Sequence, residues 1–289
     1  MIKNINNIFF ELLQVSIGTR ICLSQSLKES EKGKLYEMSK KQSLVGVCFA
    51  GVQRLQQQRQ ELPEMLYLTW MGMAAKISQN YDNIRSLEKK LDALFKERGV
   101  KVVLVKGALI AAHYDEPKLK QFGDIDIYSS YDYEVVNEIL KSIATEFNED
   151  YYRHSEAWVD NVMVENHKYL TDIRGQKRWL KFEKYLTSLT SAELASVGNG
   201  GIYHSKDMLT LLFFVYHAQA HFLFDKITMK FLVDWCVLIQ SIQIPEKVIV
   251  ERLQEYGLIR FAAMLTRISA EWLGLQVDSI YPEINVISS

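Results

Sequence analysis

The hydrophobic positions in the first third of the chain recur at helical spacing. Between Ile84 and Phe95 they fall on one face of a helix, and Gly99 follows as a residue that commonly ends helices. Pro63 stands where a helix can begin, because a first-turn residue needs no backbone donor. We therefore predict a helical region from residue 5 to about residue 98. Weaker helical patterns lie at 8–24, 34–57 and 64–79.

The pattern changes to a β-type alternation in the middle of the chain. Residues 102–105 form a β-branched run that predicts a short strand, and Asp124–Tyr128 alternates as a half-buried strand does. Residues 151–167 contain two further β-compatible stretches, and Asp160 and Asn161 between them suit a hairpin turn. Helical spacing is expected at 108–114 and 131–147.

The last third of the chain returns to helical spacing. A glycine-rich turn at 198–201 precedes a helical stretch that begins near Ser205 and continues to about Ile242. Pro245 then separates it from one or two final helices within 246–274. Two shorter helical stretches before the turn are expected at 176–188 and 190–196.

These patterns together predict an α+β fold with a small mixed β-sheet core flanked by helices. The expected regions are a helical region over 1–98, the sheet core over 99–185 and a second helical region over 186–289. Hydrophobic residues make up 48% and charged residues 24% of the chain, which is ordinary globular composition.

Charge, hydropathy and cysteine usage narrow the partners that we expect. The formal net charge is -1, so there is no strong nucleic-acid signal and no global attraction to an anionic membrane. The most apolar stretch, 208–216, has about half the length that a membrane span needs and predicts a buried helix. The 3 cysteines have no paired spacing, and the first residues show no signal-peptide pattern, so we expect a cytoplasmic protein without a membrane partner.

Two aspartates on the second predicted strand are the first candidates for chemistry. Successive side chains of a strand point to opposite faces, so Asp124 and Asp126 should project together while Ile125 and Ile127 face a core. Two adjacent carboxylates on a rigid strand repel one another unless a cation neutralises them, and Mg²⁺ prefers such oxygen ligands. Taken alone, this short motif is more often a pair of solvated acids.

A glycine turn upstream changes that interpretation. The first predicted strand ends in Lys106, Gly107 and Ala108, and a short helix is expected to follow. A glycine between a strand and a helix lets backbone N–H groups approach a phosphate closely, and a lysine adds a positive charge. An ordinary strand-to-helix turn is the alternative, but a phosphate turn combined with paired aspartates is less common than either alone.

The stretch from 102 to 128 resembles the signature of the DNA polymerase β-type nucleotidyltransferases. The matching positions are Val105–Ala108, Tyr114, Pro117, Leu119, Lys120 and Gly123–Ile127. The spacing is most similar to a bacterial family called "uncharacterised nucleotidyltransferase", and the flanking helical regions are also similar. The resemblance implies a nucleotidyltransferase core at 99–185 and Mg²⁺ (or Mn²⁺) on Asp124 and Asp126. It further implies an NTP substrate, bound through Lys106, Gly107, Ala108, Lys120 and Gly123.

The chain departs from the family pattern at two positions. Ala108 stands where a glycine or serine is common, so a hydroxyl contact to phosphate is missing while the backbone donors remain. Lys120 or Gln121 stands where the family often has arginine, so a planar bidentate fork is replaced by a point charge at best.

The resemblance also implies a third carboxylate from a later strand. Glu165 is the best match, and alternation places Met163, Glu165 and His167 on one face. Glu165 would complete the metal site and serve as general base toward an acceptor hydroxyl. Asp160 is the competing candidate, although the adjacent Asn161 favours a turn there, and a solvated surface glutamate remains the alternative for Glu165.

Two histidines four residues apart are the last candidates. His217 and His221 share one face of an apolar helix, and the family carries histidines in this region. They would contact nucleotide phosphates or bind a transition metal, or they are hydrogen-bonded histidines of the core. The role of Asp234 on the following helix stays open.

The sequence thus predicts transfer of a nucleoside monophosphate from an NTP to an acceptor, with release of pyrophosphate. The acceptor is a protein, an RNA or a small molecule, and the sequence does not identify which. The alternative is a catalytically inactive nucleotide-binding or scaffold module of the same fold. A helical interaction protein in which the Gly-Asp-Ile-Asp run is accidental is the third possibility.

Overall fold

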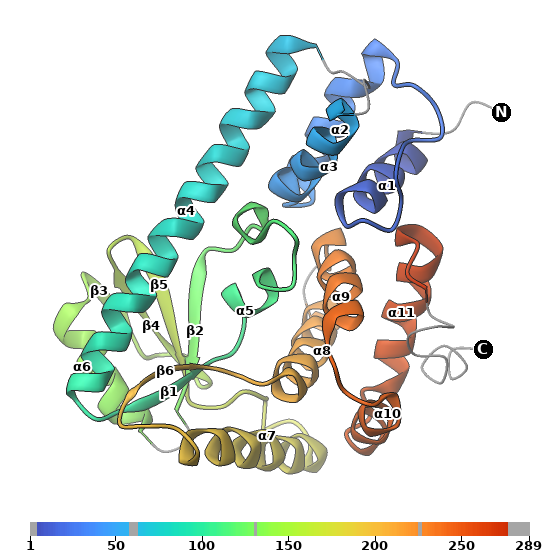
Figure 1. Ribbon diagram of the computed structural model, residues 1–289. Helices are drawn as coiled ribbons and strands as arrows, with labels where there is room; N and C mark the ends of the chain where they lie inside the picture. Colours follow the sequence, from blue (N-terminus) through green and yellow to red (C-terminus); the bar gives the residue numbers. More distant parts are fainter. Residues whose placement is uncertain (1–4, 58–62, 130–131, 225–226, 277–289) are drawn as a thin grey trace.

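The computed structural model describes residues 5–57, 63–129, 132–224 and 227–276, and its fold is α+β as predicted. A mixed sheet lies between helices from both ends of the chain, and the long helix α4 crosses the sheet diagonally (Figure 1). The amino-terminal helices are α1 Ile5–Ser16, α2 Glu29–Lys41, α3 Val45–Gln57 and α4 Glu64–Glu97.

Glycines set the ends of two of these helices. Gly99 follows α4 with a φ of +67°, which glycine adopts without a Cβ clash, and this confirms the predicted helix end. The predicted helix at 8–24 is too long, since α1 ends at Ser16 and Gly18 has a φ of +80°.

The described residues form a sheet of six strands, and two of its neighbouring pairs come from distant parts of the chain. Strand β2 pairs antiparallel with β1 and parallel with β5, while β6 pairs parallel with β1 at the sheet edge. Strands β3, β4 and β5 are successive antiparallel neighbours, and the β4–β5 turn has positive φ at Asp160 and Asn161, as the predicted hairpin requires. In sheet order the strands are β3 Glu146–Asn148, β4 His154–Val159, β5 Val162–His167, β2 Asp124–Tyr128, β1 Lys101–Leu104 and β6 Gly201–His204.

Several elements after β1 differ from the predicted ones. The stretch predicted from Ser205 to Ile242 is two helices, α8 and α9, and the two stretches predicted before the glycine turn are the single helix α7. Strand β6 was not predicted and comes from beyond residue 185, so the core sheet draws on both sides of that predicted boundary. The remaining elements are α5 Ala108–Ala111, the 3₁₀ turn η1 Pro117–Leu119, α6 Tyr133–Ile143, α7 Lys177–Ala195, α8 Asp207–Phe224, α9 Met229–Ser241, α10 Glu246–Glu255 and α11 Ile259–Leu273.

The two faces of the sheet pack against two separate hydrophobic cores. Ile125 and Ile127 of β2 belong to the core that the second half of α4 and helix α6 complete. Val103 and Tyr128 belong to the larger core, which contains the side chains of α8, α9 and α11. Because alternate residues of β2 face opposite cores, the aspartates of this strand point toward α8 and α9.

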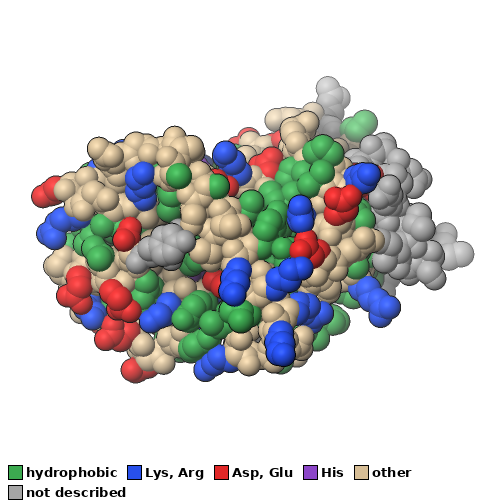
Figure 2. Space-filling model, turned by 90° about the horizontal axis from the view of Figure 1, so that it is seen from below, with side chains coloured by type: hydrophobic (Ala, Val, Ile, Leu, Met, Phe, Trp, Pro, Cys, Tyr) green, Lys and Arg blue, Asp and Glu red, His purple; other side chains and the backbone are tan. Residues whose placement is uncertain are grey.

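The surface carries both signs of charge. On the face of the molecule seen from below, Lys and Arg side chains lie among Asp and Glu side chains and apolar groups (Figure 2). Among the residues that the structure describes, no helix has the length and apolar character needed to cross a membrane.

Candidate active site

The parallel pairing of β2 with β5 brings three carboxylates together. Asp126 lies directly opposite Glu165, and Asp124 lies two residues earlier on the same face of β2. One oxygen from each of Asp124, Asp126 and Glu165 lies within 4.8 Å of the other two. The paired aspartates and the later-strand glutamate, which the sequence placed far apart along the chain, thus form one cluster.

A lysine and a histidine contact this carboxylate cluster. Lys106 Nζ lies 2.5 Å from Asp126 Oδ1 and 3.7 Å from Glu165 Oε2. His167 Nε2 lies 2.9 Å from the same Asp126 oxygen and 3.3 Å from Glu165 Oε2. Asp126 and His167 are almost completely buried, with side-chain exposures of 1% and 2%. The sequence predicted that His167 shares a strand face with Glu165, but it did not identify His167 as a partner of the acids.

These contacts favour the charged forms of Glu165, Lys106 and His167. Burial opposes ionisation of Glu165, but the hydrogen bond from His167 and the charge of Lys106 outweigh it and lower the pKa of Glu165 far below its usual value. Burial also disfavours the charged forms of Lys106 and His167, yet the adjacent carboxylates raise the pKa of both. Asp124 behaves differently, since burial and the negative charge of Asp126 raise its pKa.

The cluster fits a divalent cation. Asp126 Oδ2 is buried and has no hydrogen-bond partner among the residues that the structure describes. A buried acceptor without a partner is costly, and an ion bound by Asp124, Asp126 and Glu165 would satisfy it. Carboxylate oxygens are the ligands that Mg²⁺ and Mn²⁺ prefer.

Gly107 forms the turn that brings the first strand close to the aspartates. Its φ of +52° and ψ of −101° lie outside the regions open to residues with a side chain. A Cβ at this position would lie 3.1 Å from Phe122 Cδ2 and 3.4 Å from the carbonyl oxygen of Asp124. The helix that follows, α5, has only 4 residues, so its dipole adds little and the turn offers mainly backbone N–H groups.

A cavity of about 110 Å³ joins the glycine turn to the aspartates. Lys106 and Gly107 line it from the turn after β1, Asp124 and Asp126 from β2, and His217 from α8. The remaining lining residues are Val105, Ile110, Lys120, Phe122, Phe214, Lys230, Phe231 and Asp234. The two aspartates and the glycine turn therefore open onto the same space.

Asp234, whose role the sequence left open, forms an ion pair in the lining of this cavity. Lys120 Nζ lies 3.5 Å from Asp234 Oδ2, and the hydroxyl of Tyr114 donates a hydrogen bond of 2.5 Å to Asp234 Oδ1. Burial lowers the pKa of Lys120 to about 8, although the charge of Asp234 opposes the shift. Lys230, four residues before Asp234 on α9, lines the same cavity. This i,i+4 spacing places the two side chains on one face of the helix, and it is the sequence signal that could have identified both as site residues.

Of the remaining predicted residues His217, His221, Ala108 and Gly123, only His217 lines this cavity. The His217 and His221 Nε2 atoms lie 3.1 Å apart, and His217 lines the cavity while His221 is not among its lining residues. Burial, then the charge of Lys106, lowers the pKa of His217 well below its usual value, so its ring is neutral. Ala108 is buried at the start of α5, and Gly123 is exposed just before β2.

The structure places a carboxylate cluster beside a glycine turn, which is the arrangement that the sequence resemblance implies. The family described as "Uncharacterised nucleotidyltransferase" matches residues 28–274, and the chain belongs to this family. No curated protein and no solved structure gave a significant match. The family match confirms the predicted family and supports nucleotidyltransferase as the general class of enzyme.

Proposed function

We propose that this protein transfers a nucleoside monophosphate from a Mg²⁺-bound NTP to an acceptor and releases pyrophosphate. The observation that carries the proposal is the shared cavity, onto which Asp124, Asp126 and the Gly107 turn all open. Asp124, Asp126 and Glu165 would hold the divalent ions, Mg²⁺ or Mn²⁺. Bound there, the ions would neutralise charge on the transferred phosphoryl group and on the leaving pyrophosphate.

The lining of the cavity supports binding of a triphosphate. Lys106, Lys120 and Lys230 contribute positive charge from the turn after β1, the loop before β2 and α9, respectively. The backbone of Gly107 and Ala108 would offer N–H groups to the phosphates. His217 would contribute a neutral imidazole hydrogen bond, with His221 orienting it.

Glu165 fits the role of a metal ligand better than that of a general base. A carboxylate whose pKa is held far below neutrality binds a proton weakly, so it is a poor proton acceptor at physiological pH. The same electrostatics keep Glu165 ionised and available to a cation. We therefore assign Glu165 to the metal site and leave the deprotonation of the acceptor to another group.

A label-transfer experiment tests this proposal. The four α-labelled NTPs are incubated one at a time with the protein, Mg²⁺ or Mn²⁺, and fractionated protein, RNA and small-molecule acceptors. The proposal predicts label on one acceptor class together with release of pyrophosphate, and loss of both in the Asp124→Asn variant. Label transfer that persists in that variant would overturn the assignment of the site.

A non-catalytic nucleotide-binding module is the second candidate function. The ion pair between Lys106 and Asp126 and the alanine at position 108 favour it, since both depart from a site prepared for metal and phosphate. Under this hypothesis the protein binds Mg²⁺–NTP, yet no acceptor is labelled and no pyrophosphate appears under any condition tested.

A further inference from the structure

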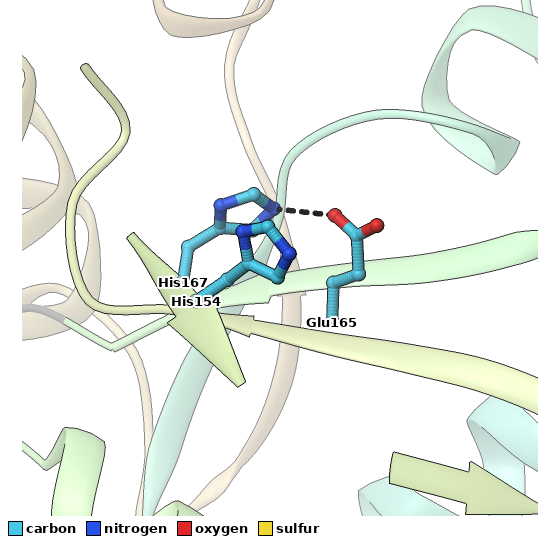
Figure 3. A group of neighbouring side chains, drawn as sticks. All are labelled: His154, Glu165 and His167. Carbon is cyan, nitrogen blue, oxygen red and sulfur yellow. Dashed lines mark ion pairs between the residues drawn. The ribbon is translucent and has the colours of Figure 1, made fainter. Parts of the chain in front are cut away.

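Two histidines and Glu165 converge on the side of the sheet next to the carboxylate cluster. His154 of β4 lies directly opposite His167 of β5, and Glu165 precedes His167 by two residues on the same face. Figure 3 shows the three side chains turned toward one another, with an ion pair between His167 and Glu165. A ring nitrogen of each histidine and an oxygen of Glu165 all lie within 4.8 Å of one another.

The hydrogen bonding of the two imidazoles is incomplete. The Nδ1 atoms of His154 and His167 are both buried and lack a hydrogen-bond partner within the described part of the chain. The contact of His154 Nε2 with Glu156 is long, at 3.4 Å. Buried ring nitrogens without partners are uncommon, because each loses its interaction with water without replacement.

Neighbouring rings hold both imidazoles in place. The His154 ring stacks on Tyr151, with centroids 5.0 Å apart and planes inclined by 14°. The His167 ring meets Phe213 of α8 edge-on at 6.2 Å. Rigid imidazoles lose little side-chain entropy on binding a ligand, so this packing favours a preorganised site.

We propose that His154, Glu165 and His167 form a second metal site that takes a divalent transition-metal ion of the Zn²⁺ type. Two imidazole nitrogens and one carboxylate oxygen are a donor set for Zn²⁺, and they leave a coordination position for water or substrate. Mg²⁺ prefers oxygen donors, so the site is distinct in its chemistry from the cluster of Asp124, Asp126 and Glu165.

The two sites share Glu165, which couples them. A zinc ion on the two histidines would draw the Glu165 carboxylate toward β4 and would also remove the hydrogen bond from His167 to Asp126. Zinc and Mg²⁺ would therefore bind with mutual antagonism. The assignment of the zinc site itself does not depend on nucleotidyl transfer, since its test measures zinc binding.

The experiment is a Zn²⁺ titration of metal-stripped protein by isothermal calorimetry, supported by the visible spectrum of the Co²⁺-loaded protein. Wild-type protein should bind one equivalent, and His154→Asn should weaken zinc binding by at least about tenfold. His154→Cys, which restores a zinc ligand, should recover most of the affinity. Circular dichroism of each variant establishes that it is folded.

His221→Asn is the matched control, because His217 and His221 form the other close histidine pair of the described chain. The proposal predicts that His221→Asn binds zinc as wild type does, and that His154→Asn keeps its Mg²⁺-dependent nucleotide binding. Unchanged zinc affinity in folded His154→Asn, or loss of zinc binding in His221→Asn, would overturn the site.

Discussion

Lys106 Nζ lies 2.5 Å from Asp126 Oδ1, so a lysine contacts the carboxylate proposed to bind metal. An ammonium group and a divalent ion compete for the same carboxylate, since both are stabilised by its negative charge. An NTP would change this balance, because its phosphates would offer Lys106 an alternative anionic partner. Under the proposed function, Lys106 would therefore link metal binding to nucleotide binding.

Replacing Lys106 by methionine should separate these two effects. We expect Lys106→Met to bind Mn²⁺ about tenfold more tightly than wild type without nucleotide, because the competing cation is removed. NTP binding should weaken, since a phosphate contact is lost. Mn²⁺ titrations followed by electron paramagnetic resonance, with and without nucleotide, measure both. Weaker Mn²⁺ binding without nucleotide would contradict the competition.

Gly107 should not tolerate a side chain. Gly107→Ala places a Cβ 3.1 Å from Phe122 at a φ of +52°, and we expect it to lower the free energy of unfolding by about 1–3 kcal/mol. Gly123→Ala is the matched control in the same region, because a Cβ there meets nothing within 4 Å. Urea unfolding of both variants tests the difference, and equal stabilities would argue against a constrained turn.

The buried Lys120 should give the protein a distinctive pH dependence. Its pKa of about 8 in the folded chain lies below the ordinary 10.5, so the unfolded chain binds this proton more tightly. Lys120 therefore makes the free energy of unfolding rise between pH 8 and 10.5, by at most about 3 kcal/mol. The buried thiols of Cys48 and Cys236, whose pKa values burial raises, act in the opposite direction above about pH 9.

A comparison with Lys120→Met isolates this contribution. The variant keeps both thiols, so the difference between its pH profile and that of wild type reports Lys120 alone. We expect the wild-type profile to rise more steeply between pH 8 and 9 in denaturant unfolding. Parallel profiles would show that burial does not lower the pKa of Lys120 in the folded chain.

Glu165 should matter for turnover more than for nucleotide affinity. If it completes the metal site, Glu165→Gln should lower kcat by about 100-fold or more while KM for the NTP changes little. Glu156→Gln is the control, because Glu156 lies opposite Glu165 on β4 but outside the carboxylate cluster. Equal effects of the two substitutions on kcat would show that Glu165 does not belong to the metal site. The steady-state kinetics require the acceptor that label transfer identifies.

Local patterns in the sequence were sufficient to predict the elements that carry the candidate site. Alternation in Asp124–Tyr128 placed Ile125 in a core and the aspartates on the other face, and the structure has the strand with these bounds. The hairpin turn at Asp160 and Asn161 was predicted equally well from the sequence, because positive φ values favour particular residue types. These features depend on chemistry within a few residues.

Features that depend on distant pairing could not be predicted in the same way. Strand β6 has only 4 residues and is defined by its hydrogen bonds to β1, about a hundred positions earlier in the chain. The facing of His154 and His167 depends on hairpin register, and the ion pair of Lys120 with Asp234 depends on how α9 packs against the sheet side. Family resemblance supplied Glu165, Lys106 and Lys120, but neither the contact of His167 with Asp126 nor the place of Lys230 in the cavity.

The most direct test of the proposed metal-dependent site is calorimetric titration of a non-reactive NTP analogue, with and without Mg²⁺. Wild-type protein should bind the analogue only when Mg²⁺ is present. The double variant Asp124→Asn with Asp126→Asn should lose at least about 100-fold in affinity while keeping its circular dichroism spectrum. Asp150→Asn, which changes an exposed acid after β3, should bind as wild type does. Mg²⁺-dependent binding that persists undiminished in the double variant would contradict a metal site on Asp124 and Asp126.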